Sequence, residues 1–185
     1  KVVLYFQQVR SLGLVRWLEV GVNLFRVPLY RVAELDASGP ALSATTLNAN
    51  VTLDGLTFKS DGAVTFGNAG TDQVTLSGGA VTIETTGAGD TLTVNSLVDG
   101  AQNLTLDTAD AAVFKAAVGS VTAIGTGLGA ALTIDSPGTT TFESTLQTAS
   151  GITQADTAGL VKFQDNVTIA AGNTATTLNA NVTLD

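Results

Sequence analysis

Carboxylates are the only side chains in this sequence that are frequent enough to suggest chemistry. The chain has 185 residues, with 16 Asp and Glu against 8 Lys and Arg, and it contains neither His nor Cys. Without His the commonest general base is missing, and without Cys there are no disulfides and no thiolate metal ligands. A pair of carboxylates could still hydrolyse a glycosidic bond, but no spacing in the sequence selects such a pair.

Five aspartates lie in or beside stretches rich in turn residues, and they are Asp61, Asp72, Asp90, Asp99 and Asp107. Asp is common there because its side chain bonds nearby backbone groups, so these positions need no catalytic explanation. Lyases of the pectate-lyase kind combine Asp with Lys and Arg on a solenoid, whereas this chain has no Arg after residue 43 and only three Lys. We therefore expect no catalytic residues and no enzymatic activity.

Residues 87–92, with the sequence GAGDTL, partly match the Gly- and Asp-rich nonapeptide that binds Ca²⁺ in parallel β-rolls. Such sites take their ligands from consecutive nine-residue units. Here the match stands alone, and residues 70–72 resemble the motif only poorly. A turn is therefore the expected structure, and we expect neither a metal site nor a cofactor.

Thr-x-Thr triplets suggest a second kind of surface, because flat Thr arrays on a solenoid face occur in ice-binding proteins. The triplets lie at residues 91–93, 139–141 and 174–176. Their spacing is irregular, so they need not align on one face. Solvent-exposed strand Thr is the preferred interpretation, and ice binding is a minor alternative.

A short triplet recurs from about residue 42 onwards: Val or Leu, then Thr, then an apolar residue. It begins at Val51, Leu56, Val64, Val74, Val81, Leu92, Leu104, Leu132, Val167 and Val182. In a strand alternate side chains share a face, so each triplet points two apolar side chains inward and a Thr outward. Turn-rich pieces separate the triplets and leave no room for helices, so residues 42–185 are predicted to be all β.

One ten-residue segment, TTLNANVTLD, occurs at residues 45–54 and again, with an identical sequence, at residues 176–185. We call these two segments the first and the second decamer. The two copies are related by a 131-residue period, and internal repetition at a fixed period indicates a repeat architecture. We interpret the chain as one full repeat plus the start of a second, which begins near residue 174.

Two all-β folds accommodate short strands at this spacing. A β-sandwich of immunoglobulin type usually has an aromatic anchor, and this chain has no Trp or Tyr after residue 43. A solenoid stacks coils of roughly 20–25 residues around a thin aliphatic core. The composition favours a right-handed parallel β-solenoid (β-helix), in which one 131-residue repeat equals about six coils; a tandem β-sandwich is the alternative.

Residues 1–35 differ in kind from the rest, since they hold the only Trp, both Tyr and five of the eight basic residues. Apolar residues in this segment follow a helical spacing at Val15, Leu18, Val22, Phe25 and Leu29. An alternation at residues 19–24 suits a strand instead, so the local structure stays ambiguous. We expect residues 1–35 to be an amphipathic cap or docking segment, residues 36–41 a linker, and residues 42–185 the solenoid.

Charge placement bears on the membrane and nucleic-acid partners. Charged residues interrupt every apolar window of about 20 residues in the first part of the chain, so no transmembrane span is expected, and no signal peptide is recognisable. Residues 44–185 carry three Lys against thirteen carboxylates. Nucleic-acid binding requires clustered Lys and Arg, so no nucleic-acid partner is expected.

Three strings carry a family resemblance: LDGLTFKSDGAVTFGNAG, GGAVTIETTGAGDTLTVN and DGAQNLTLDT. In style they resemble the repeats of large bacterial surface exoproteins of the filamentous haemagglutinin kind, over residues 42–185. The resemblance implies a β-helical stalk or fibre of an adhesin, located extracellularly or on the bacterial cell surface. As an adhesin it would have a host or surface glycan or protein as its partner. Open solenoid ends expose strand edges, so we also expect neighbouring repeats of the same chain, or end-to-end homo-oligomers, as partners.

Two further functions stay open from the sequence. One is a self-assembling extracellular filament, in which residues 1–35 dock onto the neighbouring subunit. The other is a carbohydrate-binding or glycan-active β-helix module, which would need surface aromatics beside converging charged groups.

Overall fold

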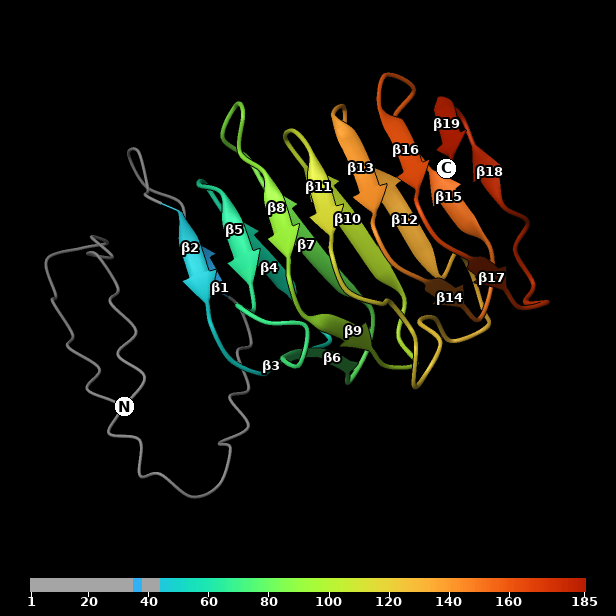
Figure 1. Cartoon of the computed structure of the whole chain (residues 1–185), viewed down its shortest axis with the longest axis horizontal. Helices are drawn as coiled ribbons and strands as arrows, with labels where there is room; N and C mark the ends of the chain where they lie inside the picture. The colour runs from blue at the N-terminus through green and yellow to red at the C-terminus, as the bar shows by residue number, and fades with distance from the viewer. Residues whose placement is uncertain (1–34, 38–43) are drawn as a thin grey trace, which may run out of the picture.

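The chain forms a parallel β-solenoid of about six turns. The computed structural model describes residues 35–37 and 44–185, and within them all regular structure is β-strand. Every strand pair in these residues is parallel. The strands stack along the long axis of the molecule in three rows, which we call sides 1, 2 and 3 (Figure 1).

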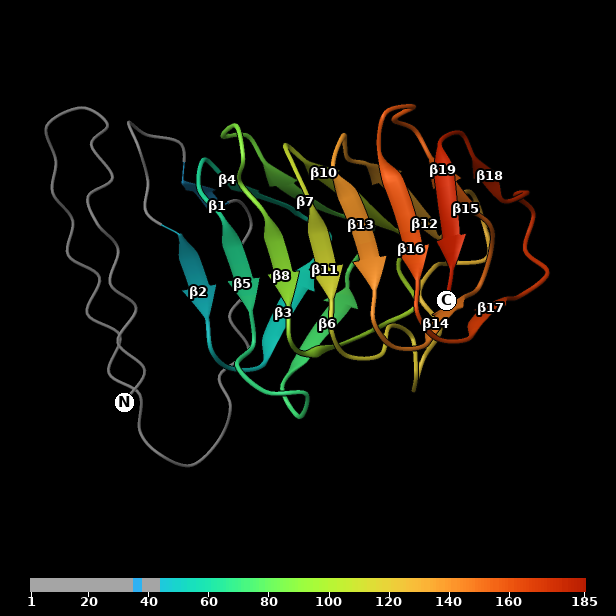
Figure 2. The ribbon, with the colours of Figure 1, turned by 45° about the horizontal axis from the view of Figure 1, so that its top comes forward.

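Each of the first two sides is a ladder to which every turn adds one strand. Side 1 contains β1 (Leu35–Ala37), β4 (Thr57–Ser60), β7 (Val81–Thr85), β10 (Leu104–Thr108), β12 (Leu132–Asp135), β15 (Ile152–Gln154) and β18 (Thr177–Leu178). Side 2 contains β2 (Thr45–Leu47), β5 (Val64–Phe66), β8 (Leu92–Val94), β11 (Ala112–Phe114), β13 (Thr139–Phe142), β16 (Leu160–Phe163) and β19 (Asn181–Leu184). Figure 2 shows side 2 facing the viewer, with its strands almost evenly spaced.

Side 3 is shorter and less regular. It contains β3 (Val51–Asp54), β6 (Gln73–Ser77), β9 (Leu97–Asp99), β14 (Leu146–Thr148) and β17 (Val167–Ile169). Between β9 and β14 the ladder is continued by Val118, which bridges to Val98 on one edge and to Leu146 on the other. Successive partners on side 1 show that the coils differ in length, since the coil from Leu106 to Ile134 is longer than the coil from Ile134 to Gln154.

The core confirms the inward and outward assignment of the triplets. In eight of the ten triplets the two flanking residues face inward, and apart from half-buried Val51 every one of them is buried. The exceptions begin at Val167 and Val182, and both lie in the last coil, where no further strand covers them in the part of the chain described. The rings of Phe114, Phe142 and Phe163 stack in register on side 2, with centroids 5.0 and 5.5 Å apart.

The two copies of the decamer occupy different sides of the solenoid. The first copy contributes β2 to side 2 and β3 to side 3, whereas the second contributes β18 to side 1 and β19 to side 2. One 131-residue period therefore spans one side less than six full coils, which refines the expected value of about six. A sequence repeat that is identical letter for letter is thus rotated by one side in space.

The parallel ladders exclude the tandem β-sandwich, which pairs its strands antiparallel. Leu35–Ala37 lie at the junction of the expected cap and linker, yet they form β1 and pair with β4, so the ladder starts before residue 42. The expected cap over residues 1–34 and the rest of the expected linker lie outside the described residues. Those described include no helix that is long and apolar enough to cross a membrane.

Candidate functional site

The outer surface of side 1 carries an unbroken row of threonines. Six consecutive coils place Thr at the same register position: Thr57, Thr82, Thr105, Thr133, Thr153 and Thr177. Thr57, Thr82, Thr105 and Thr133 are the central residues of triplets and therefore point outward. Thr153 and Thr177 lie outside the triplets but take the same outward position, because coils of unequal length return to the same register. Parallel strands lie about 4.8 Å apart, so the row presents a hydroxyl at each such step.

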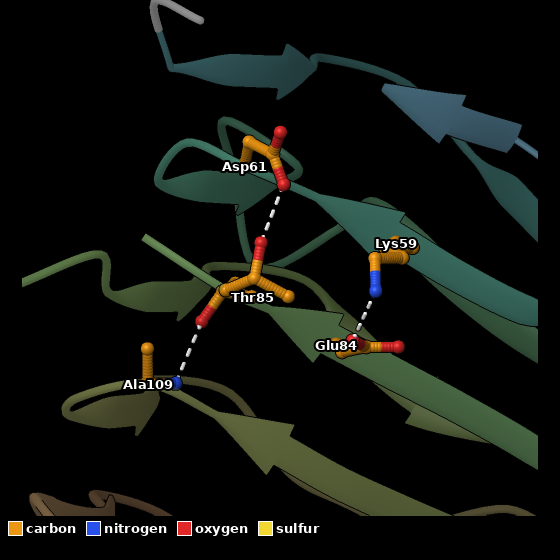
Figure 3. Close-up of polar contacts among 6 residues, drawn as sticks. Lys59, Asp61, Glu84, Thr85 and Ala109 are labelled. Carbon is orange, nitrogen blue, oxygen red and sulfur yellow. Dashed lines mark hydrogen bonds and ion pairs between the residues drawn. The ribbon is translucent and has the colours of Figure 1, made fainter. Parts of the chain in front are cut away.

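A charged row runs beside the threonines, two residues further along each strand. Lys59, Glu84, Asp107 and Asp135 are register partners on β4, β7, β10 and β12. Lys59 donates to Glu84, with Nζ 2.6 Å from Oε1, and Figure 3 shows this ion pair spanning the two strands. The ion pair leaves Asp107 next to two other carboxylates, so the stripe is negative over its later part.

The electrostatics of this row are clearest at Asp107. Partial withdrawal from water raises the pKa of its carboxyl above the ordinary value of 3.8, and neighbouring Glu84 and Asp135 raise it further. Lys59 acts in the opposite direction but is the weakest influence. Like charges in a row disfavour each other's ionisation. The row therefore attracts cations, yet the described residues contain no group of acidic side chains arranged to hold a metal ion.

Asp72 and Asp99, two of the five aspartates, bond backbone groups of turns. The Asp72 carboxylate accepts from the backbone N–H groups of Asn68 and Ala69, at 2.9 and 3.2 Å. Asp99 is buried and accepts from the N–H groups of Val121 and Thr122, at 2.9 and 3.2 Å. These bonds hold turns and loops in place, as expected for Asp.

The other three aspartates differ in their surroundings. Asp61 accepts a hydrogen bond from the hydroxyl of Thr86 in the next coil. Asp90 ends the tight turn that the sequence predicted over residues 87–92, since its N–H donates to the Gly87 carbonyl at 2.9 Å. Asp107 lies within strand β10 and belongs to the charged row, so the expectation that it sits in or beside a turn misses its main role.

The Thr-x-Thr triplets of the sequence do not build a double Thr array. On side 2 Thr93 and Thr141 are separated by Val113, and Thr141 is followed by Lys162. Residues 174–176 precede β18. The continuous Thr row on side 1 stands instead beside the charged row, and no spacing in the sequence had indicated that alignment.

Sequence reasoning also missed a buried ladder of polar side chains where side 1 turns towards side 2. Its members are Ser60, Thr85, Thr108 and Ser136, at most 2 % exposed. The Thr108 hydroxyl lies 2.8 Å from that of Ser136, and Thr85 Oγ1 accepts the Ala109 N–H at 3.1 Å (Figure 3). These hydroxyls satisfy backbone groups at the corner. In the sequence, this buried ladder is marked by a Ser or Thr two residues after the end of a triplet.

Gln154 is the other inward polar residue that the pattern did not single out. It takes the core position on β15 that Ile134 takes on β12, and it is fully buried. Its amide donates to the Gly159 carbonyl at 3.2 Å and accepts the Ala180 N–H at 3.2 Å. It thereby ties the last coil to the one before it.

The last coil exposes an apolar edge. Ile169, Val182 and Leu184 are 41 %, 40 % and 77 % exposed, although Val182 and Leu184 continue the inward columns of Val161 and Phe163. Their inner faces are open because no described strand pairs with the outer edges of β17, β18 and β19. This edge combines unpaired backbone groups with apolar side chains, which is a template for adding a strand.

The described surface thus offers a row of hydroxyl groups and a negatively charged stripe on side 1, and an exposed apolar edge at the last coil. Comparison of the chain with family models, with curated proteins and with solved structures gives no match.

Proposed function

We propose that the chain is a structural β-solenoid unit of a large secreted or cell-surface bacterial protein, where it serves as a stalk or fibre. The observation that supports this proposal most is the continuous core, in which one inward column of side 2 is apolar in every described coil. Its members are Leu47, Phe66, Val94, Phe114, Phe142, Phe163 and Leu184. The family resemblance of residues 42–185 adds the expected location, outside the cell.

The proposed action is mechanical. Each coil adds about 4.8 Å of length, and its stability comes from ladder hydrogen bonds and burial against its two neighbours. Such a rod separates whatever lies at its two ends by a fixed distance. A flexible chain with as many residues would hold its ends together more loosely.

A glycan-binding module is less well supported. Glycan sites of the kind weighed from the sequence need surface aromatics, but Trp and Tyr are absent after residue 43, and all three stacked Phe rings are buried. If the rod also contacts a host or surface molecule, the negative stripe on side 1 favours a partner with cationic groups.

The rod proposal can be tested with spin labels, because the chain has no Cys of its own. Thr46→Cys and Thr183→Cys place labels in the same outward row of side 2, six strand steps apart. A rigid solenoid predicts a narrow distance distribution centred near six steps of about 4.8 Å, roughly 29 Å plus the label arms. A broad distribution would contradict a stiff spacer.

The location requires a separate measurement. An antibody against the purified chain should label intact cells of the organism that makes it, without permeabilisation. Labelling that appears only after lysis would contradict a surface role and would leave the rod as an internal scaffold.

A second candidate, a self-assembling extracellular filament, is favoured by the open apolar edge at Ile169, Val182 and Leu184. Sedimentation of the full chain over a range of concentrations distinguishes the two, since a passive stalk stays monomeric.

A further inference from the structure

The two copies of the decamer bond their neighbours through opposite edges. In the first copy, β2 and β3 pair with β5 and β6 of the following coil. In the second copy, β18 and β19 pair with β15 and β16 of the preceding coil. The remaining edge of each copy has no strand partner among the described residues. The structure thus shows one sequence accepting a coil on either edge.

We infer that the second decamer of one chain binds β5 and β6 of a second copy of this chain, in place of that copy's own first decamer. The two chains would then share a single decamer layer and join end to end. This joint needs only the solenoid, and it holds whether or not the chain is exported.

The interactions of the joint are already present inside one chain. Leu47 lies in register with Phe66, and Leu53 with Leu76. The Asn50 amide oxygen accepts the Gln73 N–H at 2.9 Å, and the Ser77 hydroxyl donates to Asp54 at 3.0 Å.

In the joint, the corresponding residues of the second decamer of the incoming chain take these places. Leu178 replaces Leu47, Asn181 replaces Asn50, Leu184 replaces Leu53, and Asp185 replaces Asp54. Because the two decamers are identical, no side chain within them has to change, and the inward and outward columns of the two sides that they cover continue across the joint. The outward Thr177 would lie beside Thr65, just as Thr46 does within one chain.

Burial favours the exchange at the donor end. Leu184 is 77 % exposed, whereas its counterpart Leu53 is 2 % exposed beneath Leu76. The cost arises at the acceptor end, where the first decamer of the second copy must leave β5 and β6. The interactions that the first decamer loses on β5 and β6 are the same as those that the incoming decamer forms, which is the usual situation in the exchange of identical elements between chains. On the third side β1 must also leave β4, whose free edge then faces β17 of the incoming chain. Weakening the first decamer should therefore shift the balance towards assembly.

The decamer position also fixes the geometry of the assembly. The second decamer lies on sides 1 and 2, and the first decamer lies on sides 2 and 3. Side 1 of one chain would thus continue into side 2 of the next. Successive chains would be rotated by one side, so the negative stripe of side 1 would wind around the fibre.

Matched substitutions in the full chain test the inference. Leu53→Asp puts a charge into the buried position of the first decamer and frees β5 and β6, so sedimentation should show oligomers that grow with concentration. Leu184→Asp alters the same leucine where it is exposed, and that variant should stay monomeric. The double variant should also stay monomeric. The inference would be overturned if the double variant formed oligomers as large as those of Leu53→Asp. It would also be overturned if Leu53→Asp stayed monomeric at every concentration.

Disulfide trapping gives a readout that does not depend on the fold surviving Leu53→Asp. Ser77→Cys with Asp54→Cys should form a bond within one chain, because these residues are register partners. Ser77→Cys with Asp185→Cys should instead give a ladder of linked chains on oxidation, with positions 77 and 185 joined between chains. Asp107→Cys with Asp185→Cys is the control, since Asp107 lies on side 1, away from the joint. A ladder no longer than that of the control would reject the joint and leave a monomeric rod.

Discussion

Leu53 and Leu184 hold the same position in two identical decamers, yet the first is 2 % exposed and the second is 77 % exposed. Leu53 lies in register with Leu76 of the following coil, whereas the register partner of Leu184 is Phe163 of the preceding coil. The sequence within the two decamers is the same, so the difference comes from which neighbours stack on them. In a solenoid, burial is a property of the stack and cannot be assigned to a residue type alone.

The first prediction follows from this pair. Leu53→Ala should lower the free energy of unfolding by about 2–5 kcal/mol, because it opens a cavity in a packed site. Leu184→Ala should change it by less than about 0.5 kcal/mol, as expected for an exposed position. Urea unfolding at a protein concentration that keeps the chain monomeric measures both. Equal losses would contradict the placement of the second decamer at an open edge.

The second prediction concerns the ring stack. Phe142 lies between Phe114 and Phe163, with centroids 5.0 and 5.5 Å away. Phe142→Ala should cost about 3–5 kcal/mol, and Phe142→Leu should cost clearly less because most of the volume is kept. Since each coil contacts only its neighbours, hydrogen exchange should rise first in β11, β13 and β16. Exchange that rises equally in β5 and β6 would indicate that the solenoid unfolds as one unit.

The alternation of apolar residues with Thr was enough to predict the solenoid and most of its core. Each triplet such as Val81–Ile83 carries its own in-out pattern, and this pattern is local. Register between coils is not local. The Thr row and the row of Lys59, Glu84, Asp107 and Asp135 arise only when coils of unequal length are brought into alignment. Unequal turns hide that alignment from sequence spacing.

The rotation of the second decamer was hidden for the same reason. A 131-residue period does not determine the number of coils when individual coil lengths vary. Only the register partners of Thr177 and Val182, which are Thr153 and Val161, place the second copy on sides 1 and 2. Buried polar positions such as Gln154 were missed because the pattern treats a polar residue in the strand as outward.

The third prediction uses the negative stripe. The pKa of Asp107 is raised in the folded chain, so folding opposes its ionisation. This cost is absent below the ordinary pKa of 3.8, develops as the pH rises through the folded-state value, and is complete at neutral pH. Asp107→Asn should therefore stabilise the chain at pH 7 but not at pH 3.

The size of that gain should be small, on the order of 0.5 kcal/mol or less, because the row is solvated. Thermal unfolding of the parent and the variant at both pH values, in low salt, provides the measurement. Added salt should reduce the difference at pH 7, since it screens exposed charges. Equal stabilisation at pH 3 would show that the effect of the substitution does not come from charge.

The fourth prediction addresses Gln154, which lies in the core column of side 1. Its side-chain amide is hydrogen-bonded to the Gly159 carbonyl and to the Ala180 N–H. Gln154→Ala removes both hydrogen bonds and leaves a cavity, so the free energy of unfolding should fall by about 2 kcal/mol or more. Gln154→Leu restores the volume but leaves the two backbone groups unpaired, so it should recover only part of that loss. Gln147→Ala is the matched control, because Gln147 faces outward on β14 and should change stability by less than about 0.5 kcal/mol. If Gln154→Leu were as stable as the parent, the buried amide would be dispensable, and packing alone would hold the last coil in place.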